Sequence, residues 1–158
     1  MAADVYDLPG ALPQELPANY DLVFTGGGAI VWLPDIRRWA QVVASLLKPG
    51  GRLFLNDIHP VTACLWTVDG HLQITSDYFG RGQAEVDTGW SHFAGAEDAR
   101  EIKYEFNWPL GDIVTALAQA GLMIERLDEY PGGPEWRFGE KQAETLRLPG
   151  DFLLIARK

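Results

Sequence analysis

The sequence predicts an α/β domain whose sheet mixes parallel and antiparallel strands and carries an inserted antiparallel ribbon. Two apolar segments, 20–25 and 52–58, flank an amphipathic segment, a pattern typical of two parallel strands joined by a helix. Residues 60–108 break this pattern with alternating polar and apolar side chains, which favours antiparallel strands. The 158 residues suit one domain over 1–158, with 60–108 as an aromatic-rich flap.

Local signals define the first strand and the first helix. Residues 1–19 contain three prolines and predict a loop, apart from the end of a strand at 3–6. Residues 20–25 (YDLVFT) are apolar and are followed by glycines, which favours a buried parallel strand. The Pro-Asp pair at 34–35 suits a helix beginning, and KPGG at 48–51 suits its end.

The second half of the chain predicts the rest of the sheet. Three segments of the insertion, 71–79, 85–93 and 100–108, are rich in aromatic and β-branched residues that favour strands. After them we expect a helix, a strand, a loop and a final antiparallel strand, at 110–120, 122–129, 131–150 and 152–156 respectively.

Composition and charge exclude several classes of function. The net charge of −9 and the absence of a Lys/Arg cluster argue against nucleic-acid binding. A single cysteine, Cys64, excludes an internal disulfide, and His71 and His92 lack carboxylates at ligand spacing, so no metal site is expected. No apolar stretch approaches about 18 residues and no signal peptide is evident, so we expect a cytoplasmic protein with no membrane partner.

Several short segments resemble the carboxyl-terminal part of class I S-adenosylmethionine-dependent methyltransferases, from residue 3 onward. The resemblance implies a partial Rossmann-like sheet, S-adenosylmethionine as cofactor, and methyl transfer to an oxygen, nitrogen or carbon atom of a small-molecule substrate. The last matching segment stands where a related bacterial group has an EWNH-like sequence. The matching segments are YDLV (20–23), WLPD (32–35), LKPGG (47–51), HP (59–60) and EFNW (105–108).

The resemblance leaves out the family's main cofactor loop. Family members carry a glycine-rich E/DxGxGxG loop after their first strand and an acidic residue after their second, and the sequence has neither. Gly26-Gly27-Gly28 follows the equivalent of the fourth strand and lacks the GxGxxG spacing. We therefore expect a truncated methyltransferase domain that is impaired or depends on a dimer or partner, with the glycines as a wall of the pocket.

The resemblance also implies cofactor-binding residues. Asp4 and Val5 stand where the family reads the adenine edge, although Asp4 could equally be a loop carboxylate without a partner. Phe24, Thr25 and Gly26 would line the pocket for the sulfonium group by their position.

Two ionisable residues follow the second predicted strand and are candidates for catalysis. Ligands of open α/β sheets collect at the carboxyl ends of the strands, where Asp57 and His59 lie beside Asn56. His59 could act as a general base, because the pKa of histidine lies near working pH. The alternative is a histidine that bonds to nearby backbone in the turn before Pro60. Methyl transfer often relies on proximity alone, so no dedicated base is required.

The insertion has a surplus of aromatic residues, which could form a lid over an apolar substrate or could simply pack onto the sheet. We take Trp66, Tyr78, Phe79 and Trp108 as the candidate substrate pocket, and note Trp90 and Tyr104 in the same insertion. In the later loop, Trp136 and Arg137 could close this pocket.

The family resemblance also predicts an exposed sheet edge. In the family the first strand lies beside the fourth, so a chain without it exposes residues 22–25 as an apolar edge prone to pairing. We therefore expect a homodimer, or a partner chain, joined near 22–25. The alternative to an enzyme is a non-catalytic ligand-binding or protein-interaction module derived from a methyltransferase.

Overall fold

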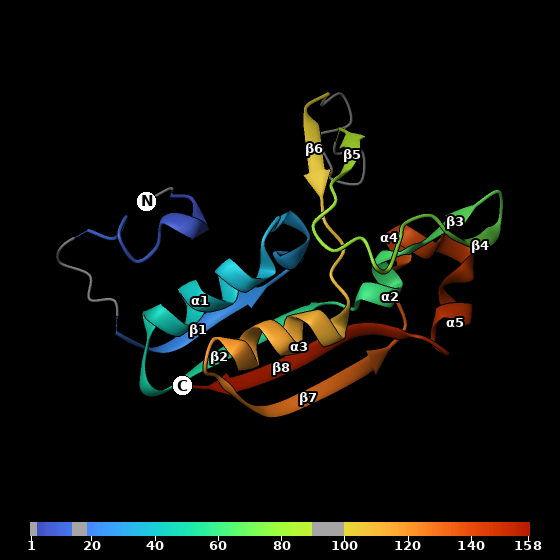
Figure 1. Ribbon diagram of the computed structural model, residues 1–158. Coiled ribbons are helices and arrows are strands. Elements are labelled where there is room, and N and C mark those ends of the chain that lie inside the picture. Colours follow the sequence, from blue (N-terminus) through green and yellow to red (C-terminus); the bar gives the residue numbers. More distant parts are fainter. Residues whose placement is uncertain (1–2, 14–18, 90–99) are drawn as a thin grey trace.

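A computed structural model describes residues 3–13, 19–89 and 100–158, in which the central feature is a four-stranded sheet of order β1-β2-β8-β7. β1 (Tyr20–Gly26) runs parallel to β2 (Leu47–Ile58), whereas β8 (Pro149–Arg157) is antiparallel to β2 and to β7 (Met123–Pro131). The predicted mixed sheet with a late antiparallel strand is therefore confirmed (Figure 1).

Two helices cover one face of this sheet. They are α1 (Ile36–Leu46) and α3 (Leu110–Gln119), which lie side by side in Figure 1 and are packed against each other. Asp35 begins α1, because its carboxylate accepts hydrogen bonds from the amides of Arg37 (3.0 Å) and Arg38 (2.9 Å). The core lies between helices and sheet, and its fully buried members include Leu53, Leu55, Ile113, Leu117, Phe152 and Leu154.

β1 lies at one edge of the sheet and, among the described residues, pairs only with β2. The apolar pattern predicted a buried strand, and its burial is wrong, because Leu22 and Phe24 are 58% and 65% exposed. Their side chains point away from the helix layer, where the ring of Phe24 stacks at 6.2 Å on that of Phe54. The strand and its parallel pairing agree with the prediction, and its edge position agrees with the expected apolar edge.

The insertion contains two separate ribbons rather than one. After the short helix α2 (Pro60–Ala63), β3 (Leu65–Val68) pairs with β4 (His71–Ile74), and β5 (Glu85–Thr88) pairs with β6 (Ile102–Glu105). Within the described residues neither ribbon joins the main sheet, and β5–β6 rises away from the body in Figure 1. Trp90 and His92 fall outside the described residues.

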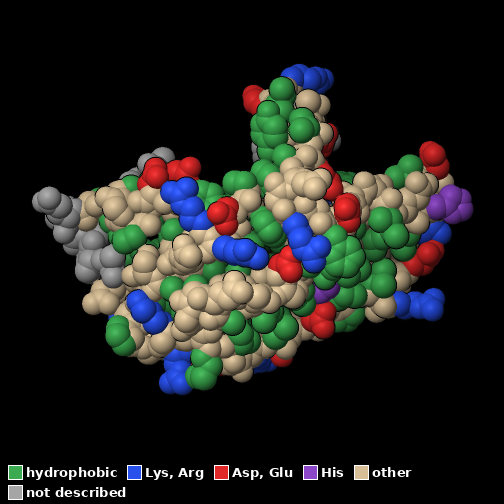
Figure 2. Space-filling model, in the orientation of Figure 1, with side chains coloured by type: hydrophobic (Ala, Val, Ile, Leu, Met, Phe, Trp, Pro, Cys, Tyr) green, Lys and Arg blue, Asp and Glu red, His purple; other side chains and the backbone are tan. Residues whose placement is uncertain are grey.

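The β5–β6 ribbon has two chemically different faces. Val86 opposes Tyr104 and Thr88 opposes Ile102, and the hydrophobic members Val86, Ile102 and Tyr104 are exposed by 53–63%. Figure 2 shows hydrophobic side chains along this protruding ribbon. The other face carries four charged residues, Glu85, Asp87, Lys103 and Glu105.

Two segments differ from their sequence-based predictions. Residues 5–7 form a 3₁₀ helix, η1 (Val5–Asp7), instead of a strand end, because the side chain of Asp4 accepts a hydrogen bond from the Tyr6 amide (2.8 Å). The predicted loop 131–150 contains α4 (Glu135–Phe138), η3 (Gly139–Lys141) and α5 (Gln142–Thr145), with Phe138 fully buried. A further 3₁₀ turn, η2 (Ile30–Trp32), precedes α1. None of the described helices has the length and apolar character needed to span a bilayer.

Candidate active site

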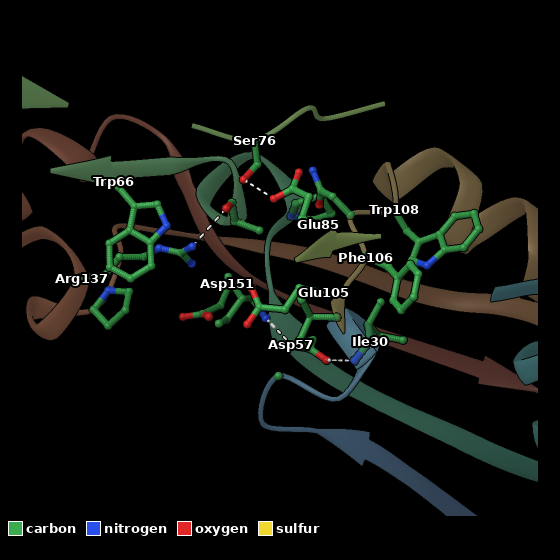
Figure 3. A pocket seen from close by; sticks show the side chains of 18 of the residues that line it. Ile30, Asp57, Trp66, Ser76, Glu85, Glu105, Phe106, Trp108, Arg137 and Asp151 are labelled. Atoms are coloured by element: carbon green, nitrogen blue, oxygen red, sulfur yellow. Dashed lines mark hydrogen bonds between the residues drawn. The ribbon is translucent and has the colours of Figure 1, made fainter. Parts of the chain in front are cut away.

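A cleft of about 1010 Å³ lies at the carboxyl ends of β1 and β2 (Figure 3). Gly27 and Gly28 line it from the turn after β1, Asn56 and Asp57 from the end of β2, and Asp151 from the beginning of β8. The charged face of the β5–β6 ribbon and the segment 131–137 complete its walls. A cleft of this size is large enough for a small-molecule ligand.

A smaller cavity of about 300 Å³ brings together four of the five predicted cofactor-binding residues. Val5, Phe24, Thr25 and Gly26 line it, whereas the carboxylate of Asp4 is exposed and caps η1. The other lining residues are Ala29, Leu33 and Trp39.

The glycine turn is the partition between the two cavities, since Gly26 lines the smaller one and Gly27 and Gly28 line the larger. A Cβ atom at Gly26 would approach the carbonyl oxygen of Asn56 to 2.7 Å. Gly27 and Gly28 adopt left-handed φ values of +72° and +81°. Gly26 is therefore required by the close approach to Asn56, and Gly27 and Gly28 suit the two positive φ angles. The turn that they form is a shared wall of the two cavities.

Asp57 anchors this turn. Its Oδ2 accepts from the Ile30 amide (3.1 Å) and its Oδ1 from its neighbour Ile58 (2.8 Å). Burial raises the pKa of Asp57, although the surrounding amides, those of Gly28 and Ala29 included, oppose the rise. Both carboxylate oxygens thus hold backbone amides, which is a positioning role.

His59 does not line the cleft; it is 3% exposed and contacts Glu129 of β7 and Phe152 of β8. Its Nδ1 accepts from the Val61 amide (3.1 Å), so the ring proton sits on Nε2, which lies 2.9 Å from Oε1 of Glu129. The ring also meets that of Phe152 edge-on. The structure thus places His59 as a cap for α2, the structural alternative considered from the sequence.

His59 gives the protein a testable pH dependence. Burial lowers the pKa of His59, and the carboxylates of Glu129 and Asp151 only partly oppose this. The unfolded chain therefore takes up the proton at a higher pH than the folded chain does, and stability is lost as the pH falls below about 6.5. In His59→Asn, whose amide oxygen can still cap α2, we expect the slope of unfolding free energy between about pH 7.5 and 5 to flatten by up to about 1.4 kcal/mol per pH unit.

Urea unfolding at stepped pH measures this slope. The matched control is His71→Asn, because His71 is exposed at the start of β4. An unchanged slope in His59→Asn, or an equal change in both variants, would contradict the assignment.

The structure separates the four predicted substrate-pocket aromatics. Trp66 and Trp108 line the cleft, and Trp108 is fixed by a hydrogen bond from its Nε1 to the Leu33 carbonyl (2.8 Å). Tyr78 and Phe79 do not line it. The Tyr78 hydroxyl accepts from the Leu110 amide at the start of α3 (3.3 Å), and Phe79 is 59% exposed.

The cleft also contains residues that sequence reasoning weighted little or missed. Trp136 and Arg137, from α4, line one wall, and Asp151 lies at the strand ends. Partial burial raises the pKa of Asp151. Asp151 gave no signal in the sequence, because only the antiparallel insertion of β8 beside β2 brings it opposite Ile58.

Most charges on the ribbon face are paired within the chain. Lys103 is 9% exposed and lies 3.0 Å from Asp87 and 3.2 Å from Glu105. Glu85 accepts a hydrogen bond from the Ser76 hydroxyl (2.6 Å). Among the described residues no group of three His, Cys, Asp or Glu side chains gathers as a metal site would require.

Comparison of the chain with solved structures identifies its fold. No family model and no curated protein matches the chain. Among solved structures, the chain is similar to a presumed S-adenosylmethionine-dependent methyltransferase from Listeria monocytogenes, with a TM-score of 0.64 and 21% identity over 99% of this chain and 67% of that one. The chain is also similar to an S-adenosylmethionine-dependent methyltransferase from Mesorhizobium loti, with a TM-score of 0.61 and 22% identity over 99% of this chain and 67% of that one. The fold is that of S-adenosylmethionine-dependent methyltransferases.

The methyltransferase fold confirms the predicted fold class, and the chain spans about two thirds of those two structures. A third match widens the chemistry that this fold carries. The [4+2]-cyclase SpnF aligns with a TM-score of 0.54 and 14% identity over 100% of this chain and 54% of that one. The methyltransferase fold therefore does not by itself dictate methyl transfer.

Proposed function

We propose that this chain binds a small-molecule substrate for S-adenosylmethionine-dependent methyl transfer. The observation that supports this proposal is the glycine turn with a cavity on each side, at the carboxyl ends of two parallel strands. In this proposal the smaller cavity takes part of the cofactor and the larger cleft takes the substrate.

The smaller cavity fits part of such a cofactor. Val5, Leu33 and Trp39 supply apolar walls suited to a flat ring, and Gly26 leaves the turn without a side chain. Its described lining contains no carboxylate for ribose hydroxyls, so the residues present account for only part of the contacts. When bound, the cofactor would supply an electrophilic methyl group on a sulfonium.

The chain's own residues would orient the substrate and take its proton. Trp66 and Trp108 line the cleft and would pack against the substrate to orient it. Asp151 lies in the cleft with a raised pKa, so its carboxylate is suited to accept a proton from a hydroxyl or amine nucleophile. We propose this role for Asp151 in place of His59, which does not line the cleft.

Calorimetric titration with S-adenosylhomocysteine tests the cofactor part. Because only part of the ligand is contacted, we expect a Kd on the order of a millimolar for the chain as a monomer. Ala29→Leu, which fills the smaller cavity, should abolish binding, whereas Ala11→Leu in the exposed amino-terminal loop should not. Micromolar affinity would indicate a site completed across a dimer.

No binding at about ten millimolar ligand, or equal binding by both alanine variants, would contradict the cofactor proposal. That result would favour the second candidate, a non-catalytic ligand-binding or protein-interaction module. The lack of a ribose carboxylate in the small cavity and the similarity to a cyclase are the observations that favour this candidate.

We further propose that β1 joins this chain to a second copy or to a partner chain. Leu22 and Phe24 are exposed on a strand whose outer edge has no described partner, and such edges pair readily. Light scattering after size exclusion should show a dimer or larger species for the purified chain, and Phe24→Lys should shift it to monomer. Met123→Lys, at the opposite edge strand β7, is the matched control. A wild-type monomer at micromolar concentration contradicts self-association.

A further inference from the structure

Arg137 is a cation in the cleft wall that has no described counter-ion. None of the ion pairs among the described residues includes it. Its Nη2 donates to the Ala63 carbonyl (3.1 Å), and its Nε is buried without a hydrogen-bond partner. Burial lowers the pKa of Arg137, and the more distant Glu105 only partly offsets this.

Leaving a guanidinium in this state costs free energy. Buried charges in folded proteins are normally paired, because desolvation is not otherwise repaid. This chain has 22 acidic residues against 13 basic ones, so a counter-ion is chemically available. A cation that stays unpaired in the wall of a cleft is therefore suited to an anion that arrives with the ligand.

Two indole rings hold the guanidinium in place. Its carbon lies 4.4 Å from the ring centroid of Trp66 and 5.9 Å from that of Trp136, and the two rings meet at 68°. Stacking of this kind fixes the plane of the guanidinium, and Nη1 has no hydrogen-bond partner among the described residues. Figure 3 shows Arg137 and Trp66 together on one wall of the cleft.

No described carboxylate forms an ion pair with Arg137, although Glu105 acts on it electrostatically and Asp151 lines the same cleft. Asp87 and Glu105 flank Lys103, Glu85 is bonded to Ser76, and Asp57 is bonded to backbone amides. The segment beside Arg137, residues 132–134, carries no charged side chain. The described neighbours that contact the guanidinium directly are thus two indole rings and a backbone carbonyl, and none of them supplies a negative charge.

We propose that Arg137 binds the carboxylate of a small apolar acid, whose body packs against Trp66 and Trp136 in the cleft. The proposal rests on the proposed function, because it names the substrate class of the same cleft. A carboxylate can accept a charge-assisted hydrogen bond from Nη1, and two apolar rings beside it favour an apolar substituent.

The test compares two probes of equal shape without cofactor, 3-phenylpropionate and its uncharged amide, by ligand-observed NMR titration. The wild-type chain should bind the carboxylate about tenfold more tightly than the amide. Arg137→Met should lose this preference and still bind the amide, since the side-chain stem and both indoles remain. Arg81→Met is the matched control, because Arg81 pairs with Asp112 outside the cleft.

A second variant keeps the test decisive if Arg137→Met does not fold. Arg137→Lys retains the charge but not the planar fork, and should keep a reduced preference of about threefold. Equal affinities of the two probes for wild type, or an undiminished preference in both Arg137 variants, overturns the proposal. Since no cofactor is added, loss of S-adenosylhomocysteine binding would overturn the proposed function and leave this result standing.

Discussion

Gly150→Ala is expected to lower the free energy of unfolding by about 3 kcal/mol or more. A Cβ atom at this position would lie 1.1 Å from the carbonyl oxygen of Gly132 and 2.3 Å from its carbonyl carbon. Both are backbone atoms at the junction of β7 and β8, so no side-chain rotation relieves the overlap. The two backbone segments would have to separate, which would strain the hydrogen bond from the Gly132 amide to the Leu148 carbonyl (3.0 Å).

Urea unfolding with far-ultraviolet circular dichroism measures this loss. Gly111→Ala is the matched control, because a Cβ there meets no atom within 4 Å and the residue lies in α3. We expect the control to gain about 0.5 kcal/mol, since alanine favours a helix over glycine. A Gly150→Ala protein as stable as wild type would show that the close approach to Gly132 is absent.

Asp57→Ala is expected to cost about 2 kcal/mol at neutral pH. The change leaves the buried amide of Ile30 without its acceptor and removes the carboxylate that fixes the glycine turn. Both cavities share that turn, so binding of S-adenosylhomocysteine and of cleft ligands should weaken together. Asp69→Asn, in the exposed turn between β3 and β4, is the control and should leave stability within about 0.5 kcal/mol.

The raised pKa of Asp57 sets the sign of its pH dependence. Burial favours the protonated carboxyl of Asp57 in the folded chain, so protonation stabilises the fold. This contribution is fully present below the pKa that Asp57 has in the unfolded chain, and it is lost as the pH rises through the pKa that it has in the folded chain. The alanine variant lacks this contribution. Its deficit relative to wild type should therefore be larger at about pH 4 than at about pH 7. A deficit that grows with rising pH would contradict the assigned direction.

The elements that the sequence predicted well are those with strong local signals. Helix α1 begins after Asp35 and β1 spans an apolar run, and both follow from capping and hydrophobic pattern within a few residues. The antiparallel insertion was predicted from alternation, but its division into two ribbons depends on pairing partners, which no local pattern specifies.

The site was predictable only where position along a strand determines it. Gly27 and Gly28 come directly after β1, and Asp57 lies at the end of β2, so topology alone brings them to the cleft. The orientation of His59 is determined by its bond to the Val61 amide, which is one of the two alternatives that the sequence left open. Arg137 and Asp151 reach the cleft through long-range packing of α4 and β8, which no spacing in the chain encodes.

The cleft is built from two parts that are attached to the core in different ways. Its floor consists of the ends of β1 and β2, which belong to the main sheet. Much of its ceiling comes from the β3–β4 and β5–β6 ribbons, which among the described residues form hydrogen-bonded strand pairs separate from that sheet. Sequence changes in the ceiling therefore alter the shape and charge offered to a ligand with little effect on the folding of the floor. An evolving or engineered lineage could exchange the insertion for a new ligand preference while keeping the same scaffold.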